Sequence, residues 1–127
     1  MNVVDSSGWV EYLAGGPNAS FFQKPLNDVE SLVVPTVSIL EVYRYVLRQR
    51  GREAALAVGA SMRQGRILDL DDGLAIEAAE LGASLQLPLA DSIIYASAQS
   101  AGATLWTQDA DFEGLEGVKY RAKRRAL

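Results

Sequence analysis

Five acidic residues of this 127-residue chain stand beside the ends of predicted strands or in the first turns of predicted helices. Asp5 ends an opening apolar run, and Asp109 and Asp111 follow a later one. Glu41 and Asp91 lie where two helices are expected to begin. Carboxylates that converge without a basic partner repel one another, so the folded state must offset that repulsion. A hard divalent cation does so directly, because Mg²⁺ and Mn²⁺ prefer oxygen ligands.

The chemistry available to the chain is narrowed by two missing residue types, since it contains no cysteine and no histidine. Disulfides, thiolate nucleophiles and cysteine-type zinc or iron–sulfur sites are excluded. A Ser-His-Asp triad, an imidazole acid–base pair and an ordinary catalytic zinc site are excluded as well. Any catalysis must therefore use carboxylates, hydroxyls, amines or an oxygen-bound metal.

The net charge of −4 hides an uneven distribution of charged residues. Six of the twelve basic residues lie between Arg44 and Arg66, and five between Lys119 and Arg125. Residues 67–118 contain ten acids and no basic residue. An acidic total argues weakly against nucleic-acid binding, which usually shows a basic balance. Two basic clusters flanking an acidic half form a different pattern from a uniformly acidic protein.

Short apolar runs alternate with segments of helical periodicity along the whole chain. We expect strands at 1–5, 31–34, 66–70, 103–107 and 118–120, and helices at 9–13, 19–28 (interrupted near Pro25), 39–50, 52–64, 74–87 and 90–101. This order predicts a single α/β domain, residues 1–127, with a central mostly parallel sheet of four or five strands in a three-layer α/β/α sandwich. Ligands collect at the carboxyl ends of such strands, where the acids lie.

Each acid also has a local interpretation. Asp5 or Asp91 could cap a helix, and residues 109–111 could form a turn. Ser38 and Glu41 fit a capping box, in which Glu41 would fold back on the Ser38 amide. The occurrence of all of them at one predicted edge of the sheet favours the metal site over five separate local roles.

Four motifs in order resemble the PIN domain family, most closely the VapC-type toxins of type II toxin–antitoxin pairs. They are Asp5-Ser6-Ser7 after the first strand, Glu41 after Pro35, Asp91-Ser92-Ile93-Ile94 followed by Ala96, and Thr107-Gln108-Asp109-Ala110-Asp111-Phe112. The resemblance implies that the metal-binding and catalytic acids are Asp5, Glu41, Asp91 and Asp109, with Asp111 as a fifth ligand. Ser6 and Thr107 match hydroxyl positions near the site. Ser7 is interpreted as a helix cap and Phe112 as a core residue.

By the same resemblance, the chain would hydrolyse RNA phosphodiester bonds with bound Mg²⁺ or Mn²⁺, as an endoribonuclease toxin. A bound metal lowers the pKa of water, and Asp91 or Asp5 could orient that water or take its proton. Arg44 and Arg48, four residues apart on one helix, are candidates for holding RNA.

The expected partners are the RNA substrate, a cognate VapB-like antitoxin and a second copy of the chain. Trp9, Tyr12, Tyr43 and Tyr45 could line an antitoxin groove or a dimer interface, although core packing is expected for at least two of them. The role of the basic segment 119–125 stays open.

Two other enzyme or signalling classes are disfavoured. A receiver domain needs adjacent acids near the first strand and a lysine near the last, but the chain has no such acid pair before residue 69 and no lysine between Lys24 and Lys119. A dehalogenase-type phosphatase needs an acid where Ser7 stands. A non-catalytic PIN-like module that binds RNA or protein is the remaining alternative. The sequence shows neither an apolar stretch long enough to span a membrane nor a signal peptide, so a cytoplasmic location is expected.

Overall fold

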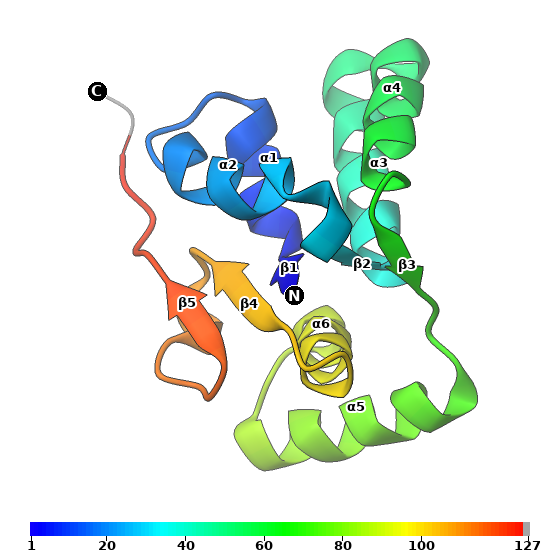
Figure 1. Cartoon of the computed structure of the whole chain (residues 1–127), viewed down its shortest axis with the longest axis vertical. Helices are drawn as coiled ribbons and strands as arrows, with labels where there is room; N and C mark the ends of the chain where they lie inside the picture. Colours follow the sequence, from blue (N-terminus) through cyan, green and yellow to red (C-terminus); the bar gives the residue numbers. More distant parts are fainter. Residues whose placement is uncertain (126–127) are drawn as a thin grey trace.

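Within residues 1–125, the part of the chain that the computed structural model describes, five short parallel strands lie between layers of helices (Figure 1). The strands are β1 (Asn2–Val4), β2 (Val33–Pro35), β3 (Arg66–Leu68), β4 (Thr104–Thr107) and β5 (Val118–Tyr120). They pair in the orders β1-β4-β5 and β2-β3. A parallel bridge between Asn2 and Leu32 connects the two groups, giving the order 3-2-1-4-5. The predicted fold class is confirmed.

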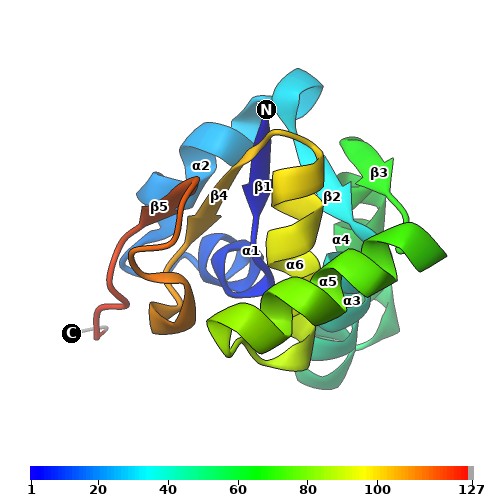
Figure 2. The ribbon, with the colours of Figure 1, turned by 90° about the horizontal axis from the view of Figure 1, so that it is seen from below.

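The helices of the described segment form three pairs around this sheet (Figure 2). They are α1 (Ser6–Leu13) and α2 (Ala19–Asn27), α3 (Thr36–Arg50) and α4 (Arg52–Met62), and α5 (Asp72–Leu85) and α6 (Leu89–Ser100), with short 3-10 helices η1 (Val29–Ser31) and η2 (Ala110–Phe112). Gly51 has a φ of +88°, which favours glycine and lets α3 turn directly into α4. None of these helices is long and apolar enough to cross a membrane.

Alternate residues of the strands point to opposite faces of the sheet, and this alternation divides the core in two. One cluster contains Val4, Val34 and Trp106 and packs against α1 to α4. The other contains Val3, Val33 and Leu105 and packs against α6 and the fully buried Phe112. A third, smaller cluster joins α5 to α6. The predicted core position of Phe112 is confirmed.

The region around Pro35 differs from the sequence-based prediction. Ser31 belongs to η1, and Pro35 is the last residue of β2 rather than a residue beyond it. The fixed φ of proline is compatible with the extended backbone at the end of a strand. Helix α3 begins directly after Pro35, at Thr36. Glu41 therefore lies in the second turn of α3, not in the first. The capping box is wrong because Ser38 is inside the helix, buried, with a hydroxyl that has no hydrogen-bond partner.

The interruption expected near Pro25 is also wrong, because α2 continues through this residue to Asn27. Pro25 removes the one hydrogen bond that its amide would donate to the carbonyl four residues earlier. Phe22 and Leu26 are buried in the core on either side of it. Packing of this face stabilises the last turn of α2.

Candidate metal centre

The acids at the ends of β1 and β4 are brought together by the pairing of these two strands. Val4 is in register with Trp106, and the chain continues on each strand into Asp5 and Thr107. The Asp5 amide donates to the Trp106 carbonyl at 3.2 Å, which extends the pairing by one residue. The Thr107 hydroxyl then donates to Asp5 Oδ2 at 2.8 Å. Parallel pairing thus joins two residues that lie 102 positions apart in the sequence.

Asp5 is held by hydrogen bonds from three directions. Its side chain is 3% exposed. Besides Thr107, the Ser7 hydroxyl lies 3.0 Å from both carboxylate oxygens, and the Gly8 amide donates to Oδ1 at 2.9 Å. Asp5 is therefore also the N-cap of α1, as the local interpretation suggested. Burial raises its pKa to about 6, although the hydrogen bonds from Thr107, Gly8 and Ser7 oppose this and nearby Asp109 adds to it.

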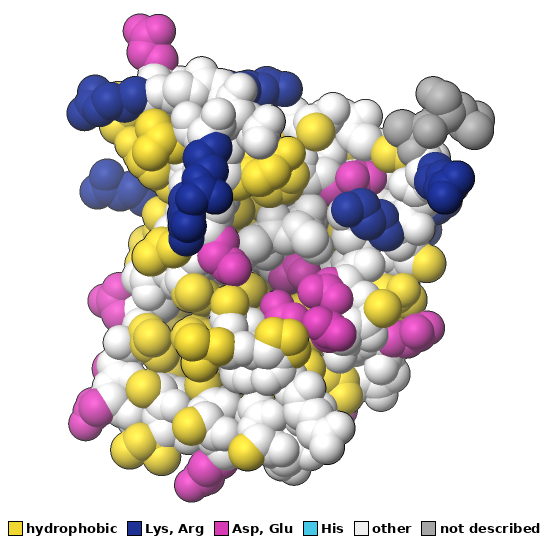
Figure 3. All heavy atoms as spheres, turned by 180° about the vertical axis from the view of Figure 1, so that it is seen from behind, with side chains coloured by type: hydrophobic (Ala, Val, Ile, Leu, Met, Phe, Trp, Pro, Cys, Tyr) yellow, Lys and Arg dark blue, Asp and Glu magenta, His cyan; other side chains and the backbone are white. Residues whose placement is uncertain are grey.

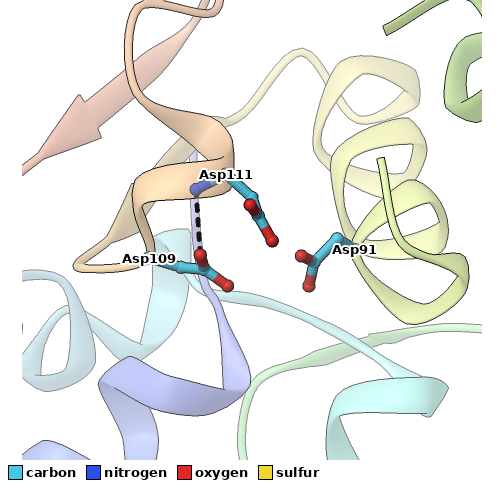
Figure 4. A group of neighbouring side chains, drawn as sticks. All are labelled: Asp91, Asp109 and Asp111. Carbon is cyan, nitrogen blue, oxygen red and sulfur yellow. Dashed lines mark hydrogen bonds between the residues drawn. The ribbon is translucent and has the colours of Figure 1, made fainter. Parts of the chain in front are cut away.

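Three further aspartates converge beside Asp5, and we call them the aspartate triad: Asp91, Asp109 and Asp111 (Figure 4). One carboxylate oxygen from each lies within 4.8 Å of the others. Asp91 stands in the first turn of α6, where Pro88 is the N-cap, so the capping role suggested for Asp91 is wrong. Asp109 follows β4 and accepts from the Asp111 amide at 2.9 Å, which turns the chain so that both side chains face Asp91.

The triad concentrates negative charge in a half-buried position. The pKa of Asp91 is raised to about 7, first by burial, then by the charge of Asp109, and then by its hydrogen bond to Asp111 and that residue's charge, with Asp5 contributing least. Acidic side chains gather in a hollow on this face of the molecule (Figure 3). Asp5 and the triad together are called the acidic centre below.

Glu41 comes from α3 and is connected to the acidic centre through Ser6, the residue after Asp5. The Ser6 hydroxyl donates to Glu41 Oε1 at 2.6 Å, which ties α3 to the start of α1. Glu41, Ser6 and Gln108 line a hollow of about 290 Å³ next to the acidic centre. The structure thus brings the four predicted aspartates together and places Glu41 at their rim, connected through Ser6.

The predicted RNA-binding and groove residues lie close by on α1 and α3. Arg44 and Arg48 are exposed on the same helix as Glu41. Trp9 is buried in the core, and Tyr12 and Tyr43 are half-buried and pack against it. Tyr45 is 46% exposed and lines a groove of about 250 Å³ between α1, α3 and α4. Core packing is therefore confirmed for three of the four aromatic residues.

Sequence reasoning missed Asn18 and Gln108, which hold the loop of the acidic centre. Asn18 is fully buried, and its Nδ2 donates to Gln108 Oε1 at 3.0 Å. The position of Gln108 between Thr107 and Asp109 was a usable signal. Asn18 is 90 residues away in a Gly-Pro-Asn turn, and its sequence context carries no sign of this contact.

The donor set of the acidic centre fits a hard divalent cation. It consists of carboxylate oxygens from separate elements, held close enough together for several of them to bind one ion. The raised pKa of Asp91 shows that nearby charge and burial oppose ionisation of the triad, and a cation would relieve both effects. The acidic centre therefore suits the binding of Mg²⁺ or Mn²⁺ and does not suit the binding of an anion.

A parallel α/β fold with an acidic centre at its carboxyl edge is the arrangement of the PIN domain. The sequence matches the PIN domain family over residues 3–118, so this chain belongs to that family. No curated protein sequence matches it significantly.

Solved structures share this fold at low sequence identity. A toxin–antitoxin complex from Klebsiella pneumoniae has a TM-score of 0.80 at 20% identity, covering 94% of this chain and 96% of that one. VapC20 of Mycobacterium tuberculosis, described as a sarcin-ricin loop cleaving toxin, has a TM-score of 0.75 at 20% identity. The match covers 93% of this chain and 97% of that one. DNA-bound VapBC from Salmonella typhimurium has a TM-score of 0.73 at 17% identity, covering 96% of this chain and 97% of that one.

Proposed function

We propose that this chain is a divalent-metal-dependent endoribonuclease and acts as the toxin of a VapBC-type pair. The observation that carries the proposal is the cluster of Asp91, Asp109 and Asp111 beside the buried Asp5 at the carboxyl edge of a PIN domain. Solved structures of similar fold include a sarcin-ricin loop cleaving toxin and toxin–antitoxin complexes, which supports a toxin nuclease activity here. RNA as substrate implies a cytoplasmic site of action.

The residues of the acidic centre have separable roles in this proposal. Asp91, Asp109 and Asp111 would hold Mg²⁺ or Mn²⁺, with Asp5 and Glu41 completing the negative surroundings. When bound, such an ion lowers the pKa of water and stabilises charge on the phosphate. The Asp5 carboxylate already accepts hydrogen bonds from three protein donors, out of about four acceptor positions. The half-buried Asp91 is therefore the better placed carboxylate to accept a proton from the attacking water.

The proposal is tested by incubating the purified chain with a panel of structured and unstructured RNAs in Mg²⁺, Mn²⁺ or EDTA. We expect cleavage in either metal and none in EDTA. A non-catalytic PIN-like module would instead bind RNA or protein and leave every RNA intact under all three conditions. That second outcome would replace the nuclease with the binding module.

The groove between α1, α3 and α4 is the proposed antitoxin site. Its lining is mostly apolar, with Gln49 and Arg50 at one part, and it adjoins the hollow that holds Glu11 and Glu41 through Tyr45, which lines both. An apolar antitoxin segment carrying a basic residue would complement the two parts. Tyr45→Ala is expected to weaken binding of the cognate antitoxin in calorimetry, whereas Val29→Ala, at an exposed residue of η1 outside this groove, is expected to leave it unchanged.

The face formed by α5 and α6 is the proposed homodimer interface. Leu89 is 82% exposed and Ile76 is 62% exposed, beside an apolar hollow of about 540 Å³. Exposed apolar surface of this kind is typical of a protein contact. Light scattering should show a dimer for the wild type and a monomer for Leu89→Glu. Leu56→Glu, at an exposed leucine of α4, is the matched control that should stay dimeric.

A further inference from the structure

The end of the described chain lies beside the acidic centre. We call residues 119–125 the basic tail, because they contain five of the twelve basic residues of the chain. The Arg121 amide donates to the Thr107 carbonyl at 3.0 Å, so the basic tail follows β4 as far as the residue that holds Asp5. A run of positive charge thus reaches the negatively charged edge of the sheet.

Asn18 fixes the basic tail in this position. Its Nδ2 donates both to Gln108 Oε1 and to the Ala122 carbonyl, each at 3.0 Å. Its Oδ1 accepts from Arg124 Nε at 3.2 Å, while Arg124 Nη2 donates to the Pro17 carbonyl at 2.8 Å. A fully buried amide whose donors and acceptor are all used holds its partners in place, because breaking these bonds would leave buried polar atoms unpaired.

Three of the five basic residues of the tail contact aromatic rings or the turn at Pro17 and Asn18. Lys119 lies 4.6 Å from the centre of the Trp106 ring, and Arg121 lies 4.7 Å from that of Phe21, on the α2 side of the sheet. Arg124 is engaged by Pro17 and Asn18. All four side chains are exposed, but Lys123 differs from the other three because it lines one hollow with Asp109 and another with Glu41.

Lys123 lines two hollows, one that includes Asp109 of the acidic centre and one on the Glu41 side, and Ser7 and Gln108 also line both. One, of about 490 Å³, is lined by Asp109, Tyr120 and Lys123 among others. The other, of about 290 Å³, is lined by Glu41, Tyr45 and Lys123 among others. Each hollow therefore combines a carboxylate of the proposed nuclease site with a tyrosine ring, and they share one lysine.

This pattern matches the way in which proteins hold unpaired nucleic acid, with cations along the backbone and aromatic rings against the bases. Basic side chains also flank the acidic hollow on two sides, on the α3–α4 hairpin and on the tail (Figure 3). We propose that the basic tail forms the second wall of the RNA path, opposite Arg44 and Arg48, and that Lys123 contacts a backbone phosphate of an unpaired RNA strand next to the metal centre. This inference rests on the proposed nuclease function and specifies what positions its substrate.

The test measures kcat and KM for an unstructured RNA oligonucleotide in Mn²⁺ at several KCl concentrations between about 50 and 200 mM. Lys123→Ala should raise KM roughly two- to fivefold with kcat little changed, because a phosphate contact acts on the bound substrate as a whole. It should also reduce the slope of log(kcat/KM) against log salt by about 0.7, the contribution of one phosphate contact on a single strand. Lys123→Arg should restore both values.

Arg66→Ala is the matched control, since Arg66 is exposed and begins β3 in register with Val33, at the amino edge of the sheet. It removes the same charge from the opposite edge and should leave KM and the salt slope at wild-type values. If Lys123→Ala behaves like Arg66→Ala while the wild type cleaves RNA, the role of the basic tail is wrong and the nuclease proposal stands. If the wild type cleaves no RNA in Mn²⁺ or Mg²⁺, the proposed function itself is wrong.

Discussion

Asp5 and the aspartate triad are neighbours in one acidic centre, yet they differ in burial and in the hydrogen bonds that stabilise their charges. Asp5 is the more deeply buried, and it accepts hydrogen bonds from Ser7, Gly8 and Thr107. The hydrogen bond that links Asp109 to Asp111 comes from a backbone amide, and the third carboxylate, Asp91, faces both of them.

The pKa values show the consequence of this difference. At Asp5, burial raises the pKa, but three hydrogen bonds lower it again, and it settles near 6. At the less buried Asp91, every contribution raises the pKa, which reaches about 7. The protein therefore stabilises the Asp5 carboxylate with its own donors. In the proposed function, Asp5 would belong to the scaffold of the site and the triad would be the cation side.

Replacing Asp91 gives the largest expected effect. Asp91→Asn keeps the size of the side chain but removes a carboxylate from the triad, so we expect metal-dependent RNA cleavage to fall by roughly 100-fold or more. The metal-free protein should become slightly more stable, because repulsion with Asp109 and Asp111 is removed. Asp28→Asn, at an exposed acid after α2, is the control for loss of one charge. Cleavage by Asp91→Asn at the rate of this control would remove Asp91 from the site.

Replacing Thr107 tests whether hydrogen bonds from the protein control the ionisation of Asp5. The Thr107 hydroxyl donates to Asp5 and accepts from the Asp109 amide at 2.9 Å, and it is fully buried. Thr107→Val should destabilise the fold by about 1–3 kcal/mol through the unpaired partners and reduce cleavage by roughly tenfold. It should also raise the pKa of Asp5 further, which would appear in the pH dependence of kcat/KM.

Thr104→Val provides the matched control, since Thr104 begins the same strand at the amino end of the sheet. It should leave cleavage and its pH dependence unchanged. An unaltered pH profile in Thr107→Val would show that the hydroxyl does not govern the ionisation of Asp5, and the distinction between scaffold and cation side would weaken.

The two sides also differ in how far the sequence predicts them. Asp5 and Asp109 follow from strand ends and Asp91 from the first turn of a helix, all short-range patterns. Glu41 was placed one turn too early because Pro35 ends β2 and α3 starts at once. The contact of Asn18 with Gln108 and the tail depends on how α1 and α2 pack against the sheet, which no local pattern encodes.

The dependence of stability on pH gives the smallest and most discriminating effect. Asp5 and Asp91 have pKa values of about 6 and 7 in the folded chain, above the ordinary value of 3.8. Between pH 3.8 and about 7 the folded chain thus binds more protons than the unfolded chain, so without metal its free energy of unfolding falls as pH rises through this window. A cation needs the ionised carboxylates, so protons compete with it in the same window.

Added Mn²⁺ should therefore raise Tm by several degrees near pH 8, since a ligand at 100 times its Kd contributes about 2.7 kcal/mol, and by much less near pH 5.5. EDTA should reverse the increase. In Asp91→Asn the increase should be largely lost at both pH values, whereas Ser6→Ala, which alters only the Glu41 rim, should keep most of it. An equal Mn²⁺ effect at both pH values would mean that the cation is held away from the groups with raised pKa values, and the triad would no longer be the cation side.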